Sequence, residues 1–139
     1  VMRWCKCSGT EFSLSYKRVG KKTWTDMELA AEKEGGRLMT LDEARLALKQ
    51  RSAMQRAIVP DRDAWAAVTN TASTCKMKIG NKEYNMDWIQ IGNRGHVTGK
   101  SHFEHHGCPN WGLIKNRPHY DSGYLMLAKL RKPAAVTKR

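Results

Sequence analysis

The sequence has no long hydrophobic run and few acidic residues. No stretch approaches the roughly 18 to 20 apolar residues that a membrane-spanning helix requires, so we expect no transmembrane segment. Asp and Glu number 13, against 25 Lys and Arg, which gives a formal net charge of +12. This charge predicts attraction to an acidic partner, whether nucleic acid, anionic lipid, glycan or protein, with a merely solvated basic surface as the alternative.

The sequence also lacks the signatures of common nucleic-acid and nucleotide sites. It has no zinc-finger spacing, no recognition-helix signature and no aromatic RNA-binding motif. Gly99-Lys100-Ser101 is not a phosphate-binding loop, because Arg94 stands where that motif requires Gly. The basic residues are dispersed rather than collected in one arm. We therefore expect no specific recognition of DNA.

Cysteines are few, and their spacing restricts how they can pair. Four cysteines permit two disulfides in an oxidising compartment. Cys5 and Cys7 are too close to bond comfortably to each other, so bridges are expected to join them separately to Cys75 and Cys108. Free buried thiols are the alternative. Position 1 is Val and no signal peptide follows it, so we expect a processed or trimmed chain, for which a secreted or an organellar location remains open.

Length and composition predict one domain over residues 1–139. The chain is long enough to bury a core, and 40% of its residues are hydrophobic, including five Trp. We expect an irregular lead-in at 1–10 and a basic tail at 131–139. Residues 92–122 hold five Gly, two Pro and all five His, with no periodicity. A loop of this length in a compact domain is usually functional.

Two capping boxes predict two consecutive helices. Thr25 and Glu28 have the spacing of a capping box, in which the side chain of each residue accepts a hydrogen bond from the backbone amide of the other. Trp24 and Leu29 have the spacing of a hydrophobic staple around this helix start. The first helix is expected at about 26–34.

The end of the first helix and the start of the second are also marked. Gly35-Gly36 supplies the left-handed residue that ends a helix. Thr40 and Glu43 then repeat the capping box, which predicts a second helix at about 41–57.

Alternating apolar residues and short apolar runs predict strands before and after the helices. The expected strands are 11–19, 63–70, 75–79, 84–91 and 123–130, with a turn at Gly80-Asn81 joining the middle pair into a hairpin. We expect strands 11–19 and 123–130 to pair and both helices to pack on their sheet, which is an α+β fold. Trp88 is expected in the core.

The order of these elements and one motif resemble the C-type lectin-like fold. The motif begins at Thr23-Trp24-Thr25, continues through Ala30-Ala31 and ends in the link Gly35 to Thr40. Formylglycine-generating enzymes share this fold and a similar link. The resemblance implies paired terminal strands and a binding site in the long loop. The calcium and sugar motifs of the family are missing, so we expect calcium-independent binding and no cofactor.

The long loop supplies the candidate site. The ligand-binding candidates are Lys100, His102, His105, His106, Asn110 and Trp111. One alternative is a zinc site formed by His102, His105, His106 and Cys108. Another is that Cys108 acts as a nucleophile. We expect no catalytic residue. The favoured function is a non-enzymatic module that binds an acidic protein or glycan, and the alternative is a basic accessory subunit of a large, for example organellar, multiprotein or ribonucleoprotein assembly.

Overall fold

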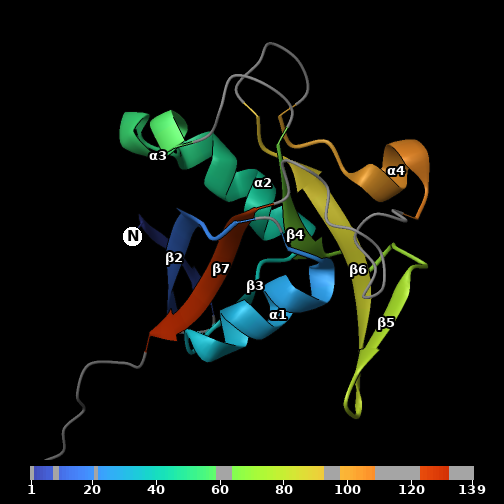
Figure 1. The fold of residues 1–139 in the computed structure, drawn as a ribbon. Helices are drawn as coiled ribbons and strands as arrows, with labels where there is room; N and C mark the ends of the chain where they lie inside the picture. The colour runs from blue at the N-terminus through green and yellow to red at the C-terminus, as the bar shows by residue number, and fades with distance from the viewer. Residues whose placement is uncertain are drawn as a thin grey trace, which may run out of the picture.

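The computed structural model describes residues 2–7, 10–20, 22–58, 64–92, 98–108 and 123–131, with side chains described from residue 18 to residue 129 within those ranges and excluding 58. Eleven elements lie in these ranges (Figure 1). In chain order they are β1 Met2–Cys7, β2 Thr10–Arg18, α1 Trp24–Lys33, β3 Arg37–Leu38, α2 Leu41–Gln50, α3 Ala53–Ile58, β4 Trp65–Thr69, β5 Lys76–Ile79, β6 Lys82–Gln90, α4 His102–His106 and β7 Tyr124–Arg131.

The strands form a mixed sheet in the order β1-β2-β7-β4-β6-β5, with β3 also paired to β7. The predicted pairing of the first and last long strands is confirmed, because β2 and β7 run antiparallel from the Glu11–Arg131 pair to the Arg18–Tyr124 pair. Strand β4 lies parallel to β7, and the other pairs are antiparallel. The lead-in was wrongly expected to be irregular, since residues 2–7 form β1 against β2.

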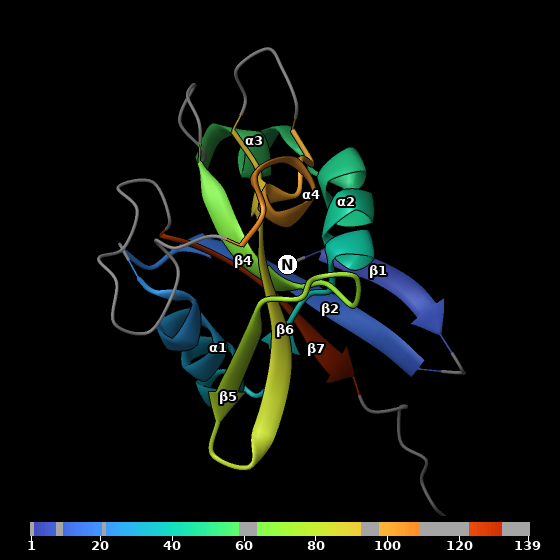
Figure 2. The same cartoon turned by 90° about the vertical axis from the view of Figure 1, so that its right-hand side faces the viewer.

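The two long helices pack on opposite faces of the sheet, so the expected α+β architecture is confirmed with a helix on each side (Figure 2). Alternation along β7 explains this arrangement, since successive strand residues face opposite sides. Tyr124 and Met126 belong to the buried cluster that contains α2, whereas Leu125 and Leu127 belong to the cluster that contains α1. Because both faces are covered there, β7 is apolar from Tyr124 to Ala128.

Helix α1 begins two residues earlier than predicted. Its N-cap is Thr23, whose hydroxyl accepts from the Asp26 amide at 3.3 Å while the Asp26 carboxylate accepts from the Thr23 amide at 3.3 Å. Trp24 is therefore inside the helix, fully buried, and its Nε1 donates to the Val68 carbonyl at 2.9 Å. Leu29 is 47% exposed, so the predicted staple is wrong.

The side chains of the incorrectly predicted box face the interior instead. Thr25 and Glu28 are both buried. Burial raises the pKa of the Glu28 carboxyl, a shift that its hydrogen bond with Tyr84 partly opposes. Burial and the neighbouring Glu28 raise the pKa of Tyr84 to about 12. The helix begins at the box that allows Trp24 to be buried, and the capping motif alone does not show which residues are buried.

The second capping box and the glycine stop are confirmed. Gly35 follows the last residues of α1 with φ of +82°, a conformation that favours glycine. The Thr40 hydroxyl accepts from the Glu43 amide at 3.2 Å, and the Glu43 carboxylate accepts from the Thr40 amide at 3.0 Å. Burial opposes ionisation of Glu43, but the Arg37 guanidinium and the Thr40 amide outweigh it and lower its pKa.

The second predicted helix is divided into α2 and α3. Arg51 has an extended backbone with ψ of 144°, which ends α2. The Ser52 hydroxyl then accepts from the Gln55 amide at 3.2 Å, and the Gln55 side chain accepts from the Ser52 amide at 2.8 Å. Ser52 and Gln55 therefore form a third capping box, which the sequence contained and which explains the break.

The predicted hairpin is confirmed as β5 and β6, which extend beyond the rest of the sheet (Figures 1 and 2). Trp88 is fully buried, as expected. Within the described part of the chain, no helix has the length and apolar character needed to cross a membrane.

Candidate functional site

A buried carboxylate on β6 fixes the segment that follows this strand. Asp87 is 0% exposed and accepts four hydrogen bonds. Its Oδ1 accepts from the backbone amides of Trp88 at 2.7 Å and Phe103 at 2.9 Å. Its Oδ2 accepts from the Asn70 side-chain amide at 2.9 Å and from the Ser101 hydroxyl. Asp87 therefore joins β6, the loop after β4 and the start of α4.

Part of the predicted irregular loop is a short helix, α4, which corrects that prediction for 102–106. Ser101 is the N-cap, and its hydroxyl accepts from the Glu104 amide at 3.1 Å. Gly107 ends the helix with φ of +79°. The backbone before α4 is held to β6, because the Gln90 amide donates to the Lys100 carbonyl at 2.8 Å. Local capping thus accompanies a helix in a segment whose sequence shows no helical periodicity.

A disulfide closes the segment after α4. Cys75 bonds to Cys108, with 5.5 Å between their Cα atoms. The expectation that Cys5 and Cys7 reach Cys75 and Cys108 separately is therefore wrong. The bond forms because the β5–β6 hairpin lies beside the end of α4, a proximity that spacing along the chain cannot show. It also removes Cys108 as a thiolate nucleophile and as a zinc ligand, since the thiolate carries out both roles.

The three histidines of α4 lie close together but differ in environment. The ring of His102 is partly buried edge-on against Trp65 at 5.5 Å, and its Nδ1 lies 3.0 Å from the Gly107 carbonyl. Burial lowers the pKa of His102, an effect that the Gly107 contact opposes and that the nearby His106 reinforces. His105 and His106 are exposed. Within the described ranges, no three His, Cys, Asp or Glu side chains converge as a metal site.

Four of the predicted ligand-binding residues therefore lie on one short segment. Lys100 is partly buried at the turn before α4, and His102, His105 and His106 are on the helix. Asn110 and Trp111 lie outside the described residues. The structure thus places the described part of the candidate segment beside β6 and α2.

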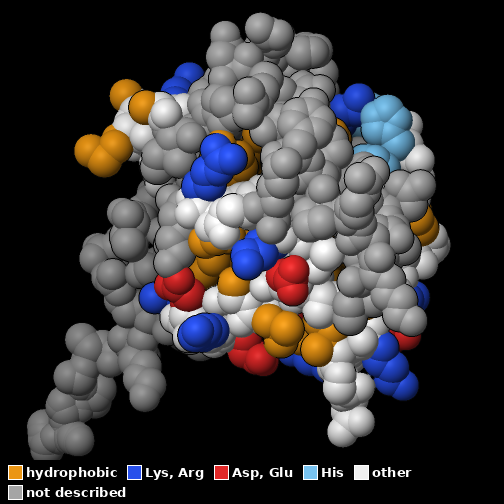
Figure 3. Space-filling model, in the orientation of Figure 1, with side chains coloured by type: hydrophobic (Ala, Val, Ile, Leu, Met, Phe, Trp, Pro, Cys, Tyr) orange, Lys and Arg blue, Asp and Glu red, His pale blue; other side chains and the backbone are white. Residues whose placement is uncertain are grey.

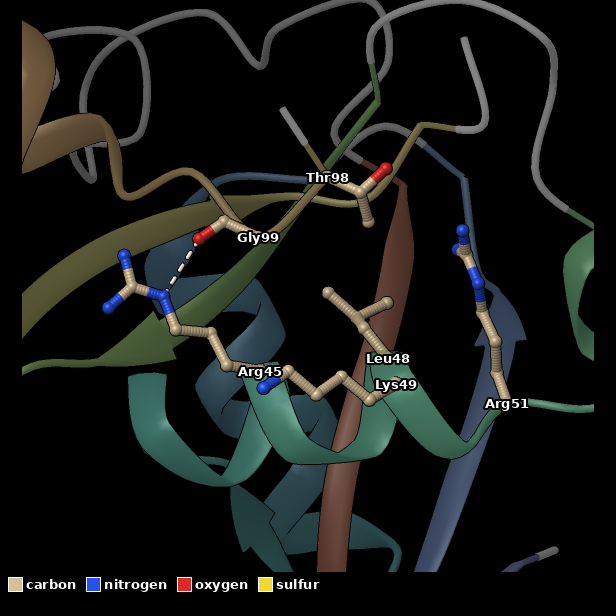
Figure 4. A pocket seen from close by; sticks show the side chains of 6 residues that line it. All are labelled: Arg45, Leu48, Lys49, Arg51, Thr98 and Gly99. Atoms are coloured by element: carbon tan, nitrogen blue, oxygen red, sulfur yellow. Dashed lines mark hydrogen bonds between the residues drawn. The ribbon is translucent and has the colours of Figure 1, made fainter. Parts of the chain in front are cut away.

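A pocket between α2 and the turn at 98–99 was not predicted from the sequence. Its volume is about 400 Å³. The lining residues, drawn in Figure 4, are Arg45, Leu48, Lys49, Arg51, Thr98 and Gly99. The helical spacing of positions 45, 48 and 49 places three of them on neighbouring turns of one face. That spacing was visible in the sequence, but the opposing wall at 98–99 was not.

Arg45 connects this pocket to α4. Its Nε donates to the Gly99 carbonyl at 2.9 Å, as the dashed line in Figure 4 shows, and its Nη2 donates to Glu104 Oε1 at 2.9 Å. Because Gly99 and Glu104 flank the start of α4, Arg45 holds both the turn and the helix against α2.

The other two cations of the pocket are less engaged. Arg51 Nη1 donates to the Ile91 carbonyl at 3.1 Å, but its buried Nε has no acceptor in the described part of the chain. Lys49 is exposed and is in none of the ion pairs resolved between described residues. Elsewhere on the face shown in Figure 3, Lys and Arg side chains are scattered.

Comparison of the chain with models of known protein families, with curated proteins and with solved structures gives no match.

Proposed function

We propose that this chain is a non-enzymatic binding module with a C-type-lectin-like fold, which recognises an acidic protein or glycan without calcium. The fold supports this proposal through its paired terminal strands, β2 and β7, and through the helices packed on their sheet. The segment between β6 and β7 spans residues 91–123, which is where the resemblance puts a binding site.

One observation carries the proposal, namely the cationic pocket beside the predicted binding segment. Arg45, Lys49 and Arg51 line it, and among the described residues that line it there is no Asp or Glu. Lys100 adds a fourth cation one residue beyond the lining turn. Opposite charges near a protein surface interact by about 4 kcal/mol at 4 Å before desolvation and screening, so several cations together favour an acidic ligand.

The first test is the salt and metal dependence of binding to an acidic polymer. Isothermal titration with polyglutamate should show affinity that falls as sodium chloride rises from about 50 to 150 mM, because the Debye length shortens toward about 8 Å. A calcium chelator should leave the affinity unchanged. Salt-insensitive binding would contradict the electrostatic part, and loss of binding in chelator would contradict calcium independence.

Matched charge reversals locate the site. Lys49→Glu and Lys100→Glu should each weaken polyglutamate binding, because they place a carboxylate at or beside the pocket. Lys78→Glu is the control, since Lys78 is an exposed residue of β5 outside the pocket. Equal losses in all three variants would show that overall charge, not this pocket, attracts the ligand.

A second candidate function is the basic accessory subunit of a large assembly. The observation that favours it is the scattered distribution of Lys and Arg in Figure 3, together with Met54 of α3, which is 78% exposed. Purification of the native chain under mild conditions distinguishes the two candidates. Stable co-purification of several chains, lost on Met54→Lys and retained on Lys49→Glu, would favour the subunit.

A further inference from the structure

The two half-cystines of the Cys75–Cys108 disulfide lie in different environments. Cys75 is 5% exposed, precedes the β5–β6 hairpin and belongs to the buried cluster that contains α1. Cys108 is exposed and follows Gly107, the residue that ends α4. A thiolate must reach the sulfur that it attacks, so access helps to decide where a disulfide opens. Attack on Cys75 would first require the buried cluster to open, a local unfolding that attack on Cys108 avoids.

Burial also decides which opened form persists. When Cys108 is attacked, Cys75 is the leaving group, and a thiolate is disfavoured among apolar side chains. Cys75 therefore leaves slowly, takes up a proton and attacks the new bond slowly in return. A thiolate released at the exposed Cys108 would close the bond again more readily. Access and burial thus both favour an adduct on Cys108.

Contacts independent of the disulfide hold the start of α4. The Asp87 carboxylate accepts from the Ser101 hydroxyl and from the Phe103 amide. After residue 104, the hydrogen bonds resolved between described residues stay within the segment, as where the Gly107 amide donates to the Phe103 carbonyl at 3.0 Å. Opening the disulfide therefore loosens the end of α4 and leaves its start in place.

We propose that Cys108 is a site of covalent modification by small thiols of the glutathione class. The glutathione thiolate attacks Cys108 Sγ, the bond between the two cysteine sulfurs breaks, and a new S–S bond joins glutathione to Cys108. The electron pair of the broken bond leaves on Cys75 Sγ, which takes a proton from solvent. One thiol is consumed and one is formed, so no oxidant is required. This inference does not depend on the proposed function.

The first experiment measures which sulfur carries glutathione. The chain with its disulfide intact is incubated with excess reduced glutathione, and thiols are then blocked with N-ethylmaleimide in mildly acidic guanidinium. Trypsin separates the two sites, because it cleaves after Lys76 and Lys100. At early times in a reaction of minutes to hours, mass spectrometry should find glutathione on Cys108 about tenfold more often than on Cys75. That ratio corresponds to about 1.4 kcal/mol between the two activation barriers.

Two results of this experiment would overturn the proposal. One is glutathione in equal or greater amount on Cys75. The other is the absence of any adduct on Cys108 after overnight incubation.

Access can also be measured without a mixed disulfide. After reduction with tris(2-carboxyethyl)phosphine, iodoacetamide should label Cys108 about tenfold faster than Cys75 in native buffer. The matched control is the same labelling in guanidinium, where the two rates should be equal because the buried cluster is gone. Equal rates in native buffer would show that the fold does not protect Cys75 and would overturn the proposal.

Hydrogen exchange tests the local effect of opening the bond. In the reduced chain, exchange of the Gly107 amide should accelerate, because the end of α4 has lost its link to the β5–β6 hairpin. The Trp88 and Phe103 amides, which donate to Asp87, should keep their protection. Equal acceleration at Gly107 and Phe103 would show that the disulfide holds the whole helix, which would overturn the local opening.

Discussion

Replacing Asp87 with Asn is the substitution with the clearest expected consequence for the candidate site. The carboxylate accepts from four donors and is fully buried. Asn is almost the same size, so no cavity forms, but it has a single acceptor oxygen and an NH₂ group. If that oxygen keeps the amides of Trp88 and Phe103, the NH₂ group faces the Asn70 amide and the Ser101 hydroxyl.

The expected loss of stability follows from these contacts. Two hydrogen bonds to a charged acceptor are lost, each worth about 1.5–3 kcal/mol. Removing a buried charge offsets part of this loss, because a buried ion carries a desolvation cost of several kcal/mol. We expect a net loss of about 3 kcal/mol. For a chain of this size this lowers the melting temperature by about 10 °C.

Urea unfolding with the Cys75–Cys108 bond intact measures this loss. Hydrogen exchange at the Phe103 amide should also accelerate, because α4 loses the Ser101 anchor at its N-cap. Asp42→Asn is the matched control, since Asp42 is exposed in the first turn of α2 and should cost below about 1 kcal/mol through the helix dipole. A loss below about 1 kcal/mol for Asp87→Asn, with Phe103 protection unchanged, would refute the structural role assigned to this carboxylate.

Three further substitutions test other features of the fold. Thr23→Ala should lower the free energy of unfolding by about 1 kcal/mol, because it removes the N-cap of α1. Thr25→Val should lower it less, because the buried Thr25 hydroxyl has no partner in the described chain. A larger loss for Thr25→Val in urea unfolding would show that Thr25, not Thr23, is the N-cap. The fold lowers the pKa of His102 below 6.5, so its stabilising contribution is complete above about pH 6.5 and is lost as the pH falls toward the native-state pKa. His102→Gln should flatten this part of the profile of melting temperature against pH, and an unchanged slope would contradict the assignment. Replacing both Cys75 and Cys108 with Ser should cost about 3–4 kcal/mol in urea unfolding, from the 33-residue separation that the bond closes; a cost below about 1 kcal/mol would show that the bond contributes little.

Several features of the fold could be predicted from the sequence because short-range chemistry encodes them. The Thr40 and Glu43 box works within one helical turn, and Gly35 adopts its positive φ whatever packs nearby. The apolar run in 123–130 likewise predicts a strand, although not which strands lie beside it. The Ser52 and Gln55 box was equally local, and recognising it would have predicted the break between α2 and α3.

Only the tertiary structure decided the features that depend on distant residues. Thr23 and Thr25 both begin acceptable capping boxes, and the choice followed from where the sheet could bury Trp24. Pairing of Cys75 with Cys108 required the β5–β6 hairpin to lie beside α4. The pocket required Arg45 of α2 to reach Gly99, 54 residues away. By itself the sequence determined the caps and stops that are set within a few residues, such as the Thr40 box and the Gly35 stop. It left open which surfaces meet, because that depends on burying apolar faces from the whole chain at once.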